Sequence, residues 1–207
     1  MSSDEALMAL AKIIASRDPD AVAHCLGTTP ELARAAFERG ATRSEARDHW
    51  LDGIGYAYAG ATALHVAAAS HQPVIAQMLI RAGADVAVAD RHGAQPIHLA
   101  AIGQPGSPHW DPSAQVSTIN LLIACGADPN AIDKRGVTPL HRAVRSRCAD
   151  AVEALLERGG DPRRPNGKGS TPLQLATNNT GRGGSGSAEA KAQQSLIIAL
   201  LQDRGAT

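Results

Sequence analysis

The residues with the clearest capacity for chemistry lie in a basic stretch of the second half of the chain. Residues 134–182 hold ten Lys or Arg against four Asp or Glu, although the whole chain has 20 of each sign. A glycine-rich segment, 178–187, overlaps the end of this stretch, and successive backbone N–H groups in such a segment can form an anion-binding nest. Guanidinium groups bind phosphates and carboxylates in bidentate geometry. The pattern indicates a small-anion site, with the candidates Arg142, Arg145, Arg147, Arg182, Gly183, Gly184, Ser185, His109 and Trp110.

Segment 178–187 matches neither of two common phosphate-binding motifs. It lacks the Gly-Lys-Thr/Ser ending of a Walker A loop, and it does not follow a strand as the dinucleotide-binding fingerprint does. A flexible Gly/Ser loop with solvated arginines is the simpler interpretation, and we favour it over the anion site.

Candidates for catalysis and metal binding are weaker still. His109, Trp110 and Asp111 adjoin in one loop and could supply a general acid or base beside a stacking ring. The sequence places no nucleophile or second carboxylate with them. Without HxH, HxxxH or CxxC spacing we expect no metal and no cofactor. Cys148 follows Arg147 and could have a lowered thiol pKa, but the expected role is a buried repeat cysteine.

These residues belong to an internal repeat, which is the strongest pattern in the chain. Four versions of one tetrapeptide each begin two residues after a glycine, and these glycines are 33, 43 and 33 residues apart. A second marker, Gly-Ala-Asp or Gly-Gly-Asp, recurs in phase at 83–85, 126–128 and 159–161. At these residues the sequence resembles the ankyrin repeat family over about residues 60–207, and bacterial members with two long inter-helix loops in particular. The tetrapeptides are Thr62-Ala63-Leu64-His65, Gln95-Pro96-Ile97-His98, Thr138-Pro139-Leu140-His141 and Thr171-Pro172-Leu173-Gln174.

The resemblance implies an all-α ankyrin-repeat solenoid of about five helix pairs with short hairpin-like turns. Thr would cap the first helix of a pair and Pro would fit its first turn. His65, His98 and His141 would join neighbouring turns by hydrogen bonds. We expect one domain over 1–207, with an N-terminal capping repeat, an aromatic insertion, three repeats and a C-terminal capping repeat at 1–37, 38–59, 60–92, 93–135, 136–168 and 169–207.

Two insertions depart from the repeat at the same position. Loops 103–113 and 178–187 each join the two helices of a pair, so the repeat register brings both to one edge of the solenoid. The repeat between them has Arg145 and Arg147 at the matching turn, and Arg142 is expected on the concave side beside them. The register therefore predicts that the two loops flank these arginines.

A third departure is the insertion at residues 38–59, which holds Trp50, Tyr56 and Tyr58, three of the five aromatic residues of the chain. Exposed Trp and Tyr are typical interface anchors, so the insertion could be a lid or recognition segment. Alternatively the rings could pack over the first repeat and cover its apolar face. We favour the covering role, because an insertion needs apolar contacts of its own to be ordered.

The leading functional hypothesis is a non-enzymatic, cytoplasmic protein–protein interaction module that binds a protein or peptide through its concave face and loops. The alternative is a small-molecule anion-binding or enzymatic site formed by loops 103–113 and 178–187 with Arg145 and Arg147. Candidate partner-binding residues are Trp50, Tyr56, Tyr58, Arg91, His92, Lys134, Arg135 and Lys168.

Composition narrows the partners and the compartment. A formal net charge of zero disfavours nucleic acid as the partner. No apolar run reaches the roughly 18 residues of a membrane helix, and the first twenty residues resemble neither a signal peptide nor an anchor. The three cysteines are odd in number and widely spaced, which fits a reducing cytoplasm.

Overall fold

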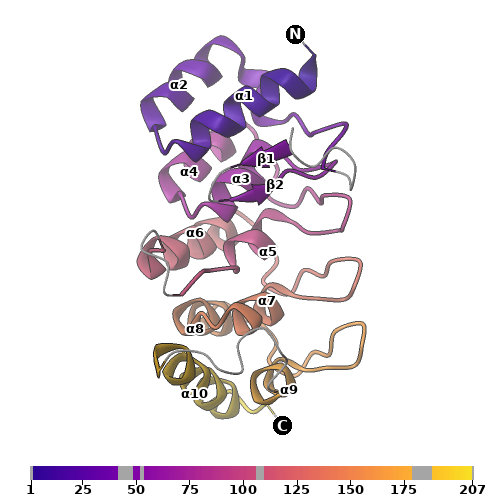
Figure 1. The fold of residues 1–207 in the computed structure, drawn as a ribbon, viewed down its shortest axis with the longest axis vertical. Helices are drawn as coiled ribbons and strands as arrows, with labels where there is room; N and C mark the ends of the chain where they lie inside the picture. The colour runs from indigo at the N-terminus through magenta and orange to yellow at the C-terminus, as the bar shows by residue number, and fades with distance from the viewer. Residues whose placement is uncertain (1, 42–48, 52–53, 106–109, 179–187, 207) are drawn as a thin grey trace.

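The computed structural model describes residues 2–41, 49–51, 54–105, 110–178 and 188–206. Figure 1 shows the helices stacked along one long axis, with α1 at one end and α9 and α10 at the other. In chain order the elements are α1 (Ser3–Ala15), α2 (Pro19–Thr28), the 3-10 helix η1 (Pro30–Ala33), β1 (Trp50–Leu51), β2 (Gly55–Tyr56), α3 (Ala63–Ala69), α4 (Pro73–Arg81), α5 (Pro96–Ala100), α6 (Pro112–Ala124), α7 (Pro139–Ser146), α8 (Ala149–Glu157), α9 (Pro172–Thr177) and α10 (Ala188–Asp203).

The helices form two parallel rows. The inner row consists of α1, α3, α5, α7 and α9, each packed on the next, and the outer row of α2, α4, α6, α8 and α10 packs in the same way. Between the rows lies a core of Ala, Leu, Ile and Val side chains, in which Phe37 is the one buried aromatic ring among the five of the chain, all of which are described. The predicted all-α solenoid of five helix pairs is thus confirmed.

Local sequence sets where the inner helices begin. Proline occupies the first turn of α5, α7 and α9, where the missing N–H is not needed. Thr138 Oγ1 accepts a hydrogen bond from the His141 N–H at 3.4 Å, and Thr171 Oγ1 accepts one from the Gln174 N–H at 3.3 Å. These side chains satisfy donors that the helix itself leaves free.

The tetrapeptide histidines connect each repeat to the next. The ring Nδ1 of His65 accepts the Thr62 N–H at 3.1 Å, and Nε2 lies 3.0 Å from the carbonyl oxygen of Ala94 in the following repeat. Because Nδ1 faces a donor, Nε2 carries the hydrogen and donates it to that carbonyl. His98 and His141 repeat the arrangement toward the carbonyl oxygens of Val137 and Ser170, at 3.1 Å each. The predicted structural role of the three histidines is confirmed.

Three projecting turns join α4 to α5, α6 to α7 and α8 to α9 (Figure 1). We call them the finger turns: residues 84–94, 127–137 and 160–170. A side-chain oxygen closes each of them. Asp133 Oδ1 accepts the N–H groups of Arg135 at 2.8 Å and Val137 at 3.0 Å, and Asp90 and Asn166 make the equivalent pairs of bonds. Each finger turn therefore presents its tip residues in a fixed conformation.

Neighbouring finger turns are also bonded to one another. The Lys134 N–H donates to the His92 carbonyl at 2.9 Å, and the Gly167 N–H donates to the Arg135 carbonyl at 2.8 Å. Gly93, with φ 79°, permits the close approach, because a Cβ there would lie 2.8 Å from the Lys134 nitrogen. The basic tip residues of successive repeats are thereby aligned.

The insertion at 38–59 contains a feature that the sequence did not predict. Strands β1 and β2 form a short antiparallel hairpin in which Trp50 pairs with Tyr56. The Ala41 N–H donates to the Ala57 carbonyl at 2.8 Å and the Ala57 N–H donates to the His49 carbonyl at 2.9 Å, which ties the hairpin to the chain on either side. Strand β1 contacts α1, so the hairpin lies at the N-terminal end of the inner row (Figure 1).

Candidate functional site

A groove runs along the face formed by the inner helices and the finger turns, and we call it the inner groove. Its first part has a volume of about 480 Å³ and its second part about 870 Å³. The two parts share four lining residues and therefore adjoin each other: Ile102, Asp133, Arg135 and Arg142.

The repeat register explains which side chains form the floor of the inner groove. The floor positions are the sixth and ninth residues after the glycine that precedes each tetrapeptide. In the first, second and fourth repeats these positions hold uncharged residues, and in the third repeat both are arginine. In chain order they are Val66 and Ala69, Leu99 and Ile102, Arg142 and Arg145, and Leu175 and Asn178, all of which line the groove.

An aromatic cluster borders the first part of the groove. The ring centroids of Trp50 and Tyr56 are 4.8 Å apart, those of Tyr56 and Tyr58 are 6.5 Å apart, and those of Tyr58 and His92 are 4.7 Å apart. The guanidinium carbon of Arg91 lies 4.7 Å from the centre of the Tyr58 ring, within cation–π range. Five of the predicted partner-binding residues thus form one contiguous surface between the hairpin and the first finger turn.

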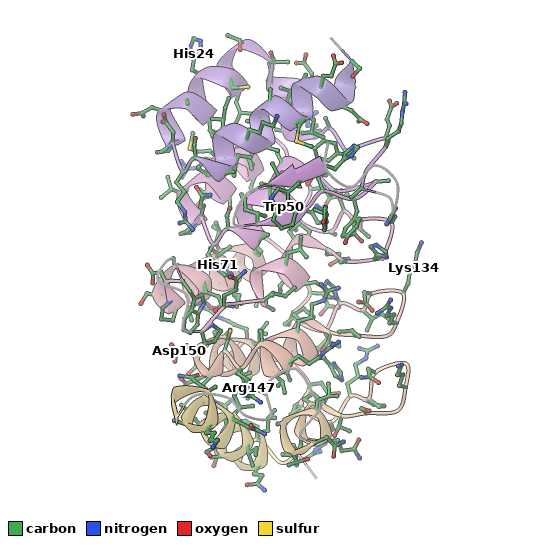
Figure 2. The ribbon with its side chains drawn as sticks, viewed as in Figure 1. His24, Trp50, His71, Lys134, Arg147 and Asp150 are labelled. Carbon is green, nitrogen blue, oxygen red and sulfur yellow. The ribbon has the colours of Figure 1, made fainter. Side chains whose placement is uncertain are left out.

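The favoured role of the three rings of the insertion is to pack over the first repeat and cover its apolar face. This prediction is wrong for Trp50 and Tyr56. Trp50 and Tyr56 each remain 46% exposed, whereas Leu51 and Ala57 are buried. Residues of a strand alternate between two faces, so the hairpin directs Leu51 into the core and Trp50 toward solvent. Figure 2 labels Trp50 at the hairpin.

The predicted arginines converge on the second part of the groove. Arg142 Nη2 lies 3.0 Å from Asp133 Oδ2, and its side chain is 20% exposed. Arg145 is exposed one turn further along α7, and Arg147 caps that helix in the left-handed conformation with φ 59°. Arg135 reaches the same space from the second finger turn. In Figure 2 Lys134 projects from the finger side and Arg147 lies on the helix side.

The two acidic side chains of the groove lining are both engaged in holding the fold. Asp90 and Asp133 are buried, and each accepts two backbone N–H groups of its own finger turn. Burial opposes ionisation of Asp133, but these N–H bonds and Arg142 outweigh it and lower the pKa of its carboxyl group. The carboxylates of Asp90 and Asp133 are therefore already bonded, to their finger turns and, for Asp133, to Arg142.

Trp110 lies outside the groove lining found in the described chain. The first long loop does adjoin the α7 turn as predicted, since the Gly103 N–H donates to Ser146 Oγ at 3.4 Å. However, Trp110 Nε1 donates to Gln115 Oε1 at 3.0 Å, and the ring packs against the core. The ring is thus held at the base of α6 and does not line the groove that the described residues form.

Cys148 also lies at this loop, completely buried. Burial raises the pKa of the thiol, against hydrogen bonds from Ser146, Gly103 and Gln115 that lower it. A raised pKa keeps the sulfur protonated, which confirms the expected role of a buried repeat cysteine.

Several candidate residues cannot be placed. His109, Arg182, Gly183, Gly184 and Ser185 lie outside the described residues. Lys168 is described and is exposed at the tip of the third finger turn, with its backbone N–H bonded to Asn166 Oδ1 at 2.9 Å.

The sequence reasoning missed the apolar floor of the groove. Leu99, Ile102 and Leu175 line it, and Ile102 is 39% exposed. The signal was present, because all three occupy the floor positions defined by the preceding glycine. Within the described ranges, no group of three His, Cys, Asp or Glu side chains could hold a metal ion, and no helix is long and apolar enough to cross a membrane.

Two models of known protein families match the repeats described above. The family model described as "Ankyrin repeat" matches residues 59–91 and 92–134, and the model described as "Ankyrin repeats (many copies)" matches residues 122–176. A comparison with curated proteins gave no match. The matched segments together cover all the regular repeats and reach the start of the last helix pair, so the chain belongs to the ankyrin repeat family.

Proposed function

We propose that this chain is a non-enzymatic module that binds a segment of a partner protein in the inner groove. Ankyrin repeats are generally protein–protein interaction modules. The observation that carries the proposal is the inner groove, whose floor residues come from four successive repeats at equivalent positions. A surface built in this way matches an elongated partner better than a compact ligand.

The dimensions and lining of the groove support a peptide segment over a small molecule. Small-molecule pockets are generally 300–1,000 Å³ in volume and enclose most of the ligand. Each part of the inner groove lies within that range in volume, but the lining extends from the hairpin to α10, a length that suits an extended segment. The ring that a small-anion site would have used, Trp110, is bonded to Gln115 instead.

The histidines of the repeats support a binding role over a catalytic one. His65, His98 and His141 use both ring nitrogens in hydrogen bonds within the fold. A general base needs a free nitrogen within reach of its substrate. The three thiols, Cys25, Cys125 and Cys148, are unpaired, which supports the cytoplasm as the compartment.

Affinity capture with matched variants tests the proposal. The groove variant is Tyr56→Ala with Arg145→Ala, and the control variant is Val74→Ala with Arg81→Ala on outer helix α4. All four residues are exposed, and neither Arg145 nor Arg81 has a side-chain hydrogen bond within the described chain. We expect a protein that the unmodified chain and the control variant capture and the groove variant loses. A protein lost by the control variant and kept by the groove variant would contradict the proposal.

A further inference from the structure

We propose that the partner segment is an extended acidic peptide with a bulky apolar residue that lies against the aromatic cluster. This inference rests on the proposed function and adds the chemistry and the direction of the bound segment. It follows from the distribution of charge along the inner groove.

The groove lining is basic, although the chain as a whole is neutral. Five Lys or Arg side chains and two Asp side chains line its two parts. Both aspartates are buried and bonded to backbone N–H groups, so they are not available to neutralise a second cation. The cations are Lys134, Arg135, Arg142, Arg145 and Arg147.

Three of the cations face solvent. Lys134, Arg135 and Arg145 are exposed, and in the part of the chain that is described their side chains make no ion pair. Arg142 differs, because its pairing with Asp133 fixes the direction of its guanidinium group. Since both arginines of α7 are three residues apart, their side chains share one face of the helix. The groove therefore offers a row of cations with one member already oriented.

The position of the charge within the groove gives the bound segment a direction. Only the third of the four repeats has arginine at its floor positions, and the two preceding repeats contribute Val66, Ala69, Leu99 and Ile102. The exposed rings of Trp50 and Tyr56 border this apolar end. A ligand that matches the apolar end and the arginines of the third repeat must carry an apolar anchor at the hairpin and carboxylates over α7.

The spacing between the two ends sets the spacing in the peptide. Tyr56 and Tyr58 line the first part of the groove together with Val66 and Ala69 of α3, and α7 is two helices further along the inner row. Packed helices lie about 8–10 Å apart, which gives roughly 20 Å between the ends. An extended chain rises about 3.3 Å per residue, so about six residues separate the apolar anchor from the acidic group.

A peptide is favoured over a nucleic acid as the acidic ligand. Nucleic-acid affinity depends on the number of phosphates neutralised, and high-affinity binders contact many of them. In the inner groove Arg142 is paired with Asp133, and four of the floor positions nearest the rings are apolar. An apolar floor provides no contact for a phosphate backbone.

Selection from a library of random linear peptides, displayed without any chosen sequence, tests the inference. We expect the enriched peptides to carry Asp or Glu about six residues from an aromatic or aliphatic residue, the spacing that the helix and strand dimensions require. A synthetic copy of an enriched peptide should lose about tenfold or more in affinity with Arg145→Glu, because a like charge would face its carboxylates. The matched variant Arg81→Glu, at the last turn of outer helix α4, should leave its affinity unchanged.

The possible outcomes separate the inference from the proposed function. Enriched peptides that lose affinity with Tyr56→Ala but are neutral or basic would overturn the acidic ligand and leave the groove as the binding site. Enriched peptides that are indifferent to Tyr56→Ala, Ile102→Glu and Arg145→Glu, or a failure to enrich any, would overturn the groove itself. Tighter binding of single-stranded RNA than of the best peptide, lost with Arg145→Glu, would replace the peptide by a nucleic acid.

Discussion

Arg142, on the floor of the inner groove, pairs at 3.0 Å with Asp133, whose other carboxylate oxygen closes the second finger turn. This one contact joins the two structural elements that form the groove, the inner helix and the finger turn. It also explains why an arginine is tolerated at a floor position that holds Val66, Leu99 and Leu175 in the other repeats.

The two functions of Asp133 can be separated by substitution. Asn166 closes the third finger turn with the same two bonds, so Asp133→Asn should keep the turn and lose the ion pair alone. We expect Asp133→Asn to lower the free energy of unfolding by about 1 kcal/mol. Asp133→Ala also leaves two N–H groups unbonded and should lower it by about 2–3 kcal/mol. Urea denaturation of both variants measures the difference, and equal losses would show that the turn does not depend on this oxygen.

The fold should lose stability in mild acid. Burial, aided by the nearby Arg142, lowers the pKa of His98 to about 4, and burial lowers the pKa of His65 and His141 as well. Below the ordinary pKa of 6.5 the His98 ring binds a proton in the unfolded chain but stays neutral in the folded chain. Stability is therefore lost as the pH falls from about 6.5 toward 4, by about 3 kcal/mol for His98 alone.

A glutamine at the same position provides the control for this pH dependence. Gln174 occupies the histidine position of the last tetrapeptide, and its Oε1 accepts the Thr171 N–H at 3.0 Å. His98→Gln should therefore retain the cap, lose the bond to Val137, and show a smaller loss of stability between pH 7 and pH 4. Thermal denaturation across this range measures the change. An unaltered pH profile in His98→Gln would rule out titration of His98 as its cause.

The backbone at Arg147 predicts an unusual order of variants. With φ 59° this residue is in the left-handed region, which costs a residue with a Cβ about 1–2 kcal/mol. Both Arg147→Gly and Arg147→Ala remove the guanidinium group, but only glycine relieves the strain. We expect Arg147→Gly to be more stable than Arg147→Ala by about 1 kcal/mol in chemical denaturation. The opposite order, with alanine the more stable, would be incompatible with this conformation.

The environment of Cys148 predicts slow thiol chemistry. Its sulfur is buried and its thiol pKa is raised by that burial, whereas Cys25 and Cys125 are partly exposed. An alkylating reagent added to the native protein should label Cys25 and Cys125 well before Cys148, and all three together in denaturant. Mass spectrometry of the time course measures the order. Early labelling of Cys148 in the native protein would mean that the first long loop opens readily.

Much of the fold could be predicted because the repeat constrains it at many positions together. The tetrapeptide, the glycine before it and the following Gly-Ala-Asp marker fix the helix pairs, and the ring nitrogens of His65 bond as that register requires. The hairpin at Trp50 and Tyr56 escaped prediction because two-residue strands leave no periodic pattern.

The candidate site could be predicted only in part. Spacing correctly placed Arg142, Arg145 and Arg147 in one groove, because they belong to one repeat. It could not orient Trp110, since that depends on a single hydrogen bond to the buried side chain of Gln115. Nor did it reveal the apolar floor, because Ile102 is apolar like a core residue and only its position after the preceding glycine distinguishes it.

Site-specific photo-crosslinking tests the central claim most directly. A photoreactive residue placed at Ile102 stands on the groove floor, and one placed at Val74, which is 63% exposed on outer helix α4, serves as the control. Binding of a protein segment in the inner groove predicts a crosslinked partner protein from position 102, suppressed by Tyr56→Ala with Arg145→Ala, and none from position 74. Crosslinks from position 74 and none from position 102 would contradict it.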